Sequence, residues 1–151
     1  MEDTAEARNY RREMVDHQLR RRGITNRVLL EAFEKVPRHF FCPPGTSLAD
    51  AYGDFPLPIG EGQTISQPAM VASMTEQLKL QGGERVLEVG TGSGYQATIL
   101  AWLCDKVYTI ERYASLAERA RNIMEPMGLD NVHVKTGDGT EGWRENAPYD
   151  G

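Results

Sequence analysis

A run of strand-forming residues, Arg85–Val89, leads directly into a loop with glycine at every second position, Gly90–Gly94. A helical pattern begins straight after the loop, at about Tyr95. Glycine permits backbone conformations and close ligand approaches that a side chain would prevent, and such a loop presents backbone N–H groups at the carboxyl end of the strand. This order of elements predicts an α/β architecture with a binding site at that end of the strand.

The alternation of strand and helix continues to the end of the chain. A second strand is predicted at Lys106–Ile110 and a third around Val132 and Val134, with a helix between them that ends at Gly128. Strands that alternate with helices of this length are typical of a parallel sheet with right-handed crossovers. We therefore expect an α/β fold with a helical N-terminal extension.

The N-terminal extension is predicted to contain three helices. The first runs from Thr4 to Arg22, the second ends before Pro37, and the third begins near Pro68. Thr25 or Asn26 could cap the second helix. By their spacing, the apolar residues expected on the buried faces of the second and third helices are Val28, Leu29, Ala32, Phe33, Val36, Met70, Val71, Met74 and Leu78.

The segment from Pro37 to Gln67 has a different composition. Its prolines and glycines prevent long regular elements. Long irregular segments inside a domain often carry binding or catalytic residues. This segment is therefore a candidate for part of a functional site.

Charge and cysteine content narrow the classes of function. The 151-residue chain has 17 basic and 22 acidic residues, a net charge of −5, which argues against nucleic acid or an anionic membrane as partner. Its apolar runs are all too short to span a bilayer. Cys42 and Cys104 are far apart and the histidines are scattered, so neither a disulfide scaffold nor a metal site is expected. These features favour a reducing, cytoplasmic location.

The residues around the glycine loop restrict the choice of cofactor. A nicotinamide fingerprint needs a third glycine where Tyr95 stands, and a phosphate-binding P-loop needs a lysine that is absent here. Glu88 precedes the loop, where a carboxylate would attract an ammonium group rather than a pyrophosphate. Glu111 closes the next strand, about where a carboxylate grips ribose hydroxyls. S-adenosyl-L-methionine carries both an ammonium group and a ribose.

Several segments together resemble a known family. The run VLEVGTGSGYQA, followed by VYTIER, GDGTEGW and APYD, resembles the class I methyltransferase pattern. With LPIGEGQTISQPAMVASMTEQL the chain resembles the protein-L-isoaspartate O-methyltransferase family, from about Arg12 to its end. The resemblance implies a Rossmann-like parallel sheet and S-adenosyl-L-methionine as cofactor. It also implies methyl transfer to the α-carboxyl of L-isoaspartyl residues in damaged proteins and peptides, which is a repair reaction.

The resemblance also implies roles for individual residues. The residues expected to bind the methionine part of the cofactor are Glu88, Gly90, Gly92 and Gly94; those expected at its ribose and adenine are Glu111, Arg112, Asp138 and Gly139. Ser66 would be the active-site residue, and Gln63, Thr64 and Ile65 would flank the cofactor. Residues 1–80 would supply the helices and the substrate loop, and residues 81–151 an incomplete cofactor-binding core, within a single structural domain.

The implied chemistry agrees with the residue types present. A carboxylate substrate is ionised at neutral pH and can attack a sulfonium methyl group without a general base. The protein then has to orient the two reactants and exclude water. Ser66 has a second interpretation, because a serine just before Gln67 and Pro68 could simply cap the following helix.

Other functions stay open on the sequence alone. They are a class I methyltransferase with another acceptor, a non-catalytic fragment that binds S-adenosyl-L-methionine, and, more distantly, a nicotinamide-dependent oxidoreductase. Residues 147–151 resemble the start of a fourth strand, and members of the family continue beyond this point. The chain is therefore expected to be truncated and weakly active. The strand at residues 85–89 would have one unpaired edge through which copies of the chain could associate.

Overall fold

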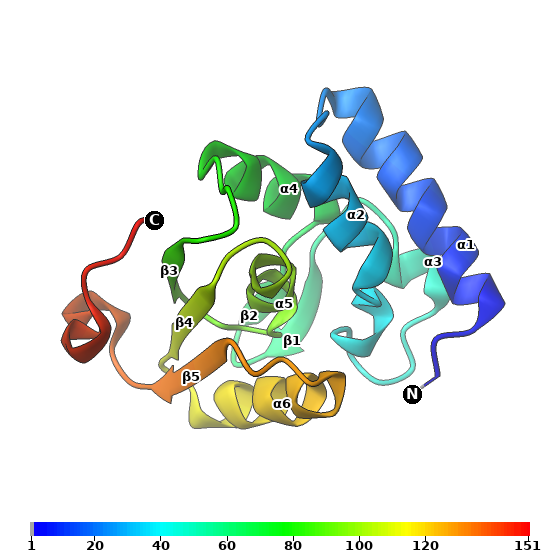
Figure 1. The fold of residues 1–151 in the computed structure, drawn as a ribbon. Coiled ribbons are helices and arrows are strands. Elements are labelled where there is room, and N and C mark those ends of the chain that lie inside the picture. The colour runs from blue at the N-terminus through cyan, green and yellow to red at the C-terminus, as the bar shows by residue number, and fades with distance from the viewer. Residues whose placement is uncertain (1) are drawn as a thin grey trace. The chain divides into compact units, whose positions relative to one another are not determined.

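A computed structural model describes residues 2–151 (Figure 1). The chain divides into two compact units, one ending at Lys79 and the other covering Leu80–Gly151. Each unit has its own set of elements and its own buried side chains. None of the helices within residues 2–151 has the length and apolar character needed to cross a membrane.

The first unit begins with a long helical segment. Helix α1 (Ala5–Met14) continues into a π-helical turn (Val15–Leu19) and a 3-10 turn (Arg20–Arg22). The Thr4 hydroxyl accepts a hydrogen bond from the Ala7 N–H at 3.1 Å, and Gly23 ends the segment with φ of 90°. Glycine adopts this left-handed conformation without strain. The predicted helix over residues 4–22 is confirmed.

Helix α2 (Arg27–Lys35) begins at Asn26, whose side chain accepts a hydrogen bond from the Leu29 N–H. Of the two candidate caps, Asn26 is thus the one used. The predicted buried face is correct except at Val28, which is 59% exposed, while Leu30 is buried in its place. Val28 and Leu30 lie on opposite sides of Leu29, each about 100° around the helix axis. Which of them is buried therefore depends on the neighbouring elements.

Helix α4 (Pro68–Gln77) begins at the predicted proline but buries a different face from the predicted one. Met70, Met74 and Leu78 are 50%, 43% and 38% exposed, so their assignment to the core is wrong. The buried face consists mostly of small residues together with one predicted member, Val71; it is formed by Pro68, Ala69, Val71, Ala72 and Thr75. Small side chains let neighbouring elements approach closely. The spacing of the large apolar residues in the sequence does not reveal such a face.

Short elements occupy the irregular segment between α2 and α4. They are a 3-10 turn (Arg38–Phe40), helix α3 (Leu48–Ala51) and an antiparallel hairpin of β1 (Leu57–Gly60) and β2 (Gln63–Ile65). At the hairpin turn Glu61 and Gly62 have φ of 53° and 67°. The prediction that residues 37–67 contain no long regular element is confirmed.

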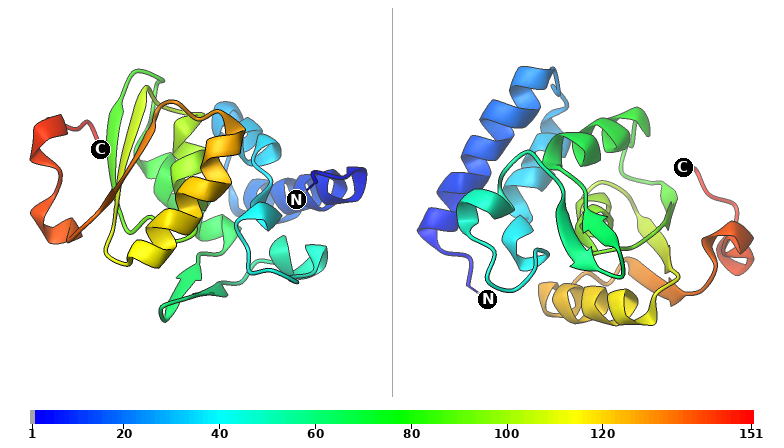
Figure 2. Two further views of the ribbon diagram at one scale, coloured as in Figure 1. Left: turned by 90° about the horizontal axis from the view of Figure 1, so that it is seen from below. Right: turned by 180° about the vertical axis from the view of Figure 1, so that it is seen from behind.

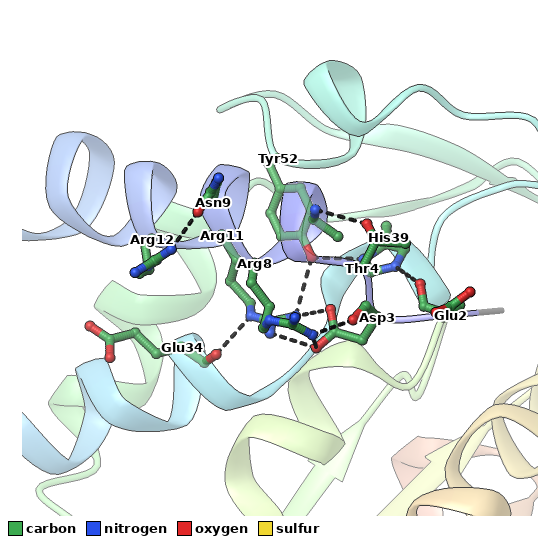
Figure 3. Close-up of polar contacts among 11 residues, drawn as sticks. Glu2, Asp3, Thr4, Arg8, Asn9, Arg11, Arg12, Glu34, His39 and Tyr52 are labelled. Atoms are coloured by element: carbon green, nitrogen blue, oxygen red, sulfur yellow. Dashed lines mark hydrogen bonds and ion pairs between the residues drawn. The ribbon is translucent and has the colours of Figure 1, made fainter.

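A buried polar cluster joins the start of the chain to the rest of the first unit (Figure 3). The Arg11 guanidinium is 2.9 Å from the Asp3 carboxylate, donates to the Glu34 carbonyl at 2.7 Å, and lies 3.5 Å from the Tyr52 hydroxyl. That hydroxyl is 2.7 Å from Nδ1 of His39. Burial raises the pKa of Tyr52 to about 12, so its hydroxyl stays neutral. The cluster connects the N-terminal residues with α1, α2 and α3.

The second unit is built on a three-stranded parallel sheet in the order β3-β4-β5. Its strands are β3 (Arg85–Val89), β4 (Lys106–Glu111) and β5 (Val132–Thr136), connected by α5 (Tyr95–Ala101) and α6 (Ala114–Met124). The left view of Figure 2 shows both helices on the same face of the sheet. The predicted strand and helix alternation, including the helix end at Gly128, is confirmed.

On the opposite face of the sheet, the Tyr108 ring contacts three aromatic rings, those of His133, Trp143 and Tyr149, at centroid distances of 5.0, 5.4 and 5.8 Å. Aromatic contacts of this kind add to the stabilisation from burial. They hold the segment after β5 against the sheet (Figure 2).

The last residues of the chain pair with β3 on the side away from β4. The Asp150 N–H donates to the Arg85 carbonyl at 2.8 Å, and the Leu87 N–H donates to the Gly151 carbonyl at 3.0 Å. Strand β3 therefore has a neighbour on each side, as the resemblance implied. The expectation of an unpaired edge at Val86, Leu87 and Val89 is therefore wrong at Leu87.

Candidate functional site

The glycine loop connects the carboxyl end of β3 to α5 within the second unit. Gly90, Gly92 and Gly94 have φ of 93°, 54° and 86°, values that side chains disfavour. The N–H groups of Gly90 and Thr91 donate to the Ile110 carbonyl at 2.7 and 3.3 Å, which ties the loop to the end of β4. The backbone conformation of this loop thus favours glycine at three positions.

Two of these glycines have different surroundings. A Cβ atom at Gly94 would lie 3.2 Å from Cβ of Ala120 and 3.4 Å from Sδ of Met124, so this glycine lets α6 approach the loop. A Cβ atom at Gly90 would have no neighbour within 4 Å. The loop thus packs tightly beside α6 and has space beside Gly90.

The Glu111 carboxylate holds the glycine loop from the end of β4. Its Oε2 accepts a hydrogen bond from the Gly92 N–H at 2.8 Å, and its Oε1 accepts one from the Tyr113 N–H at 3.0 Å. The residue is only 5% exposed. Each carboxylate oxygen can accept a second hydrogen bond, so the group can still receive ligand hydroxyls.

Glu88 supplies a second carboxyl group, in the strand before the loop. Its side chain is half-buried, and its Oε1 accepts a hydrogen bond from the Thr109 hydroxyl at 2.6 Å. Burial is the main reason that the pKa of Glu88 is raised to about 8. The Glu111 carboxylate acts in the same direction, and the Thr109 hydrogen bond acts against both. A cation beside Glu88 would favour its ionised form.

The loop after β5 completes this end of the sheet. The Asp138 carboxylate accepts hydrogen bonds from the N–H and hydroxyl of Thr140 at 2.9 and 2.7 Å, and these bonds hold the pKa of Asp138 below its usual value. A Cβ atom at Gly139 would collide with the Val89 side chain. Gly139 therefore lets this loop lie directly against the end of β3.

The structure thus brings together the predicted residues of the second unit. They come from the carboxyl ends of three adjacent parallel strands, where ligands of open α/β sheets bind. They are Glu88, Gly90, Gly92 and Gly94 after β3, Glu111 and Arg112 after β4, and Asp138 and Gly139 after β5. The Arg112 guanidinium lies over the Tyr113 ring at 5.6 Å from its centroid.

The other predicted residues lie in the first unit, in and after β2. Gln63 and Thr64 are exposed, Ile65 is buried and Ser66 is half-buried. The N-cap residue of α4 is Gln67, and among the described residues no side chain caps this helix. The alternative interpretation of Ser66 as a helix cap is therefore wrong.

Sequence reasoning missed two residues of the second-unit site. Thr109 lies directly opposite Glu88 in the register of β3 and β4, and Thr91 contacts Thr109 at 2.7 Å between hydroxyl oxygens. The available signal was a threonine two residues before Glu111, in a strand otherwise made of large side chains. Strand alignment, which the sequence does not state, was needed to interpret it.

Comparisons with known proteins identify the family of the chain. The family described as protein-L-isoaspartate(D-aspartate) O-methyltransferase matches residues 9–151. A relative named protein-L-isoaspartate O-methyltransferase, from Syntrophotalea carbinolica, is 55% identical over 141 residues, which are 93% of this chain and 64% of the relative. One from Geobacter metallireducens is 58% identical over 140 residues, again 93% and 64%. The chain therefore spans slightly less than two thirds of these relatives.

Solved structures show the same fold. A protein-L-isoaspartate O-methyltransferase has a TM-score of 0.84 at 31% identity, covering 92% of this chain and 45% of its own. A Plasmodium falciparum structure in complex with S-adenosyl-L-homocysteine has a TM-score of 0.73 at 24% identity, covering 89% and 66%. The fold is that of the class I methyltransferases. The chain belongs to the protein-L-isoaspartate(D-aspartate) O-methyltransferase family.

Proposed function

We propose that this protein uses S-adenosyl-L-methionine to methylate the α-carboxyl group of L-isoaspartyl residues in damaged proteins and peptides. The observation that carries the proposal is the pair of carboxyl groups, Glu88 and Glu111, on the two sides of a loop whose conformation favours glycine. Family membership over residues 9–151 supports the acceptor.

The residues of the second unit fit such a cofactor chemically. Glu88 is suited to the ammonium group of the methionine part, because an ionised carboxylate attracts it. Glu111 has acceptor positions left for ribose hydroxyls after binding Gly92 and Tyr113. The space beside Gly90 leaves room for a ligand against the main chain. We assign Gly92, Gly94, Arg112, Asp138 and Gly139 to the same site.

Bound S-adenosyl-L-methionine supplies an electrophilic methyl group on a sulfonium. The acceptor carboxylate is already ionised at neutral pH, so the protein needs no general base for it. We propose that Ser66 orients this carboxylate and that Gln63, Thr64 and Ile65 contribute to cofactor binding. The GQTISQP segment supports this assignment.

The proposal has a direct test. Calorimetry with S-adenosylhomocysteine and with NADP should give binding of the first ligand and none of the second. Methyl transfer should then occur to an isoaspartyl peptide and not to its aspartyl twin. Binding without transfer to either peptide would favour a cofactor-binding fragment, and transfer to another acceptor would identify a different methyltransferase.

We also propose a cytoplasmic location and no nucleic acid partner. The supporting features are the two buried cysteines, Cys42 and Cys104, which form no disulfide, and the net charge of −5. Fractionation of the native host, and a titration with duplex and single-stranded nucleic acid at low salt, would test these two points.

A further inference from the structure

Three side chains of the second unit form a continuous chain of hydrogen bonds beneath the glycine loop. The hydroxyl of Thr91 is 2.7 Å from that of Thr109, which is in turn 2.6 Å from Oε1 of Glu88. Thr109 is fully buried and Thr91 is 4% exposed. A buried hydroxyl without a partner is costly, so these contacts strongly restrict the rotamers of both threonines.

The direction of the hydrogen bonds follows from the charge of Glu88. An ionised carboxylate can only accept, so Thr109 must donate its proton to Glu88. The Thr109 oxygen is then free to accept, and Thr91 donates to it. Each donated hydrogen bond polarises the next, so the two hydrogen bonds together stabilise negative charge on Glu88.

The chain of hydrogen bonds also links Glu88 to the glycine loop. Thr91 is a loop residue, and its neighbour Gly92 is bound by Glu111 from the other direction. Besides the backbone hydrogen bonds to Ile110, two side chains of β4 therefore hold the loop, one through a hydroxyl and one through a carboxylate. Loss of the hydroxyl contact would leave the Glu111 contact in place.

Resting on the proposed function, we propose that Thr109 and, behind it, Thr91 are positioning residues for the cofactor. They favour the charged form of the Glu88 carboxyl group and fix the orientation in which it receives the ammonium group of the methionine part. Neither threonine needs to touch the ligand. The adenosine part is bound by other residues and should be insensitive to them.

The surroundings of Glu88 predict a pH dependence. The charged group of β4 that acts on Glu88 is Glu111. Lys106, the other charged residue of β4, lies opposite Arg85 at the far end of the strands. Asp150 is also at that far end, where it binds the Arg85 N–H, and α5 begins without charged residues. With a raised pKa, Glu88 gains charge as the pH rises past neutrality. Affinity for an ammonium-bearing ligand should therefore rise with pH, and removal of the Thr109 hydroxyl should move this rise to higher pH.

The experiment compares two ligands and three variants by calorimetry from about pH 6 to about pH 8.5. S-adenosylhomocysteine has the ammonium group, and 5′-methylthioadenosine lacks the amino-acid part. We expect Thr109→Val to weaken S-adenosylhomocysteine about tenfold at neutral pH, the usual size for a hydrogen bond to a charged group. Binding of 5′-methylthioadenosine should stay within about twofold. Thr109→Ser should restore binding.

Thr75→Val is the matched control. Thr75 is also a buried threonine, and its hydroxyl donates to the Val71 carbonyl in α4. This variant should leave the affinity of both ligands unchanged. An equal loss of both ligands in Thr109→Val, or no loss of S-adenosylhomocysteine, would overturn the inference.

A measurement without any ligand separates this inference from the proposed function. Titration of the Glu88 carboxyl carbon by NMR should give a higher pKa in Thr109→Val than in the wild-type chain, and Thr91→Val should give a smaller change of the same sign. Should Thr109→Val fail to fold, Thr91→Val decides alone. An unchanged Glu88 titration overturns the inference even if the cofactor binds. A wild-type chain that binds neither ligand overturns the proposed function and the positioning role together.

Discussion

Both oxygens of the Glu111 carboxylate accept backbone N–H groups, so at the scale of single residues this side chain holds the glycine loop before any ligand is bound. The sequence predicted a ligand contact for Glu111 and did not predict the contact with the loop. Because Glu111 has this second role, a substitution there should reduce both cofactor affinity and the stability of the glycine loop.

Glu111→Gln should weaken S-adenosylhomocysteine by about 1.5–3 kcal/mol. The amide nitrogen of glutamine would face the N–H of either Gly92 or Tyr113. Both groups are donors, so one hydrogen bond would be lost and the two N–H groups would repel each other. Calorimetry measures the affinity and thermal unfolding the stability. Glu118→Gln, an exposed change of the same kind on α6, is the control. Unchanged binding of adenosine-containing ligands to Glu111→Gln would remove the ribose assignment.

Ser66→Ala should lower the rate of methyl transfer more than it lowers cofactor affinity. Because Ser66 is not the cap of α4, the free energy of unfolding should change by no more than about 0.5 kcal/mol. Initial rates with an isoaspartyl peptide, calorimetry and denaturation measure the three quantities.

Ser47→Ala is the matched control for Ser66→Ala. Ser47 does cap a helix, because its hydroxyl accepts the Asp50 N–H at 3.0 Å. This variant should cost about 1 kcal/mol of stability and leave transfer unchanged. If Ser66→Ala instead lost stability and left the transfer rate intact, Ser66 would be a structural residue.

At the scale of elements, the polar cluster around Arg11 joins the N-terminal residues to three helices of the first unit (Figure 3). Asp3 lies outside the segment that the family matches, since the match begins at residue 9. The hydrogen bond from Arg11 is the main reason that the pKa of Asp3 is lowered. The folded chain therefore binds the Asp3 proton less readily than the unfolded chain.

Asp3→Asn should lower the free energy of unfolding by about 1 kcal/mol at neutral pH. Because the folded-state pKa is lowered, the contribution of Asp3 is fully present above its unfolded pKa of about 4 and is lost as the pH falls through the folded value. Denaturant unfolding at pH 7 and at about pH 3 should show a larger difference from wild type at the higher pH.

Asp16→Asn serves as the control for Asp3→Asn. Asp16 also pairs with an arginine, Arg20, but its side chain is 58% exposed, so the change should stay within about 0.5 kcal/mol. A stability difference for Asp3→Asn that is the same at both pH values would contradict the role of its charge.

At the scale of the whole molecule, β3 still presents an apolar residue at the edge that residues 150–151 pair with. Successive residues of a strand alternate in direction, so the Val89 N–H points to the same edge as the Leu87 N–H. Val89 is 64% exposed. Such an edge favours pairing with another chain.

We predict that the 151-residue chain self-associates through this edge. Sedimentation velocity should show a concentration-dependent shift toward larger species. Val89→Lys should reduce the shift because a lysine on an edge strand disfavours pairing. Val28→Lys, a change at a 59% exposed valine on α2, should not reduce it. A wild-type chain that stays monomeric at all concentrations would contradict the prediction.

Much of the fold and part of the site could be predicted from the sequence, for physical reasons that are local. The positive φ values at Gly90, Gly92 and Gly94 favour glycine wherever such a loop occurs, so the loop is visible in the sequence. Local signals also limited the cap of α2 to Thr25 or Asn26 and indicated the helix end at Gly128. The order of strands and helices follows from these signals, and so does the end of the sheet at which the residues proposed to bind the cofactor gather.

Only the tertiary structure decided which side chains meet. The buried face of α4 is the one with alanines rather than methionines, because close packing selects it and helical spacing alone does not. Arg11 and Tyr52 are 41 positions apart, and Thr109 and Glu88 are 21 apart. Contacts at such separations depend on how strands align and how helices pack, and the sequence of either segment does not contain that information.

By itself the sequence determined the order of elements, the glycine loop and the family, because those depend on local conformation and motif. The hydroxyl chain that positions Glu88 exists only once β3 and β4 lie side by side.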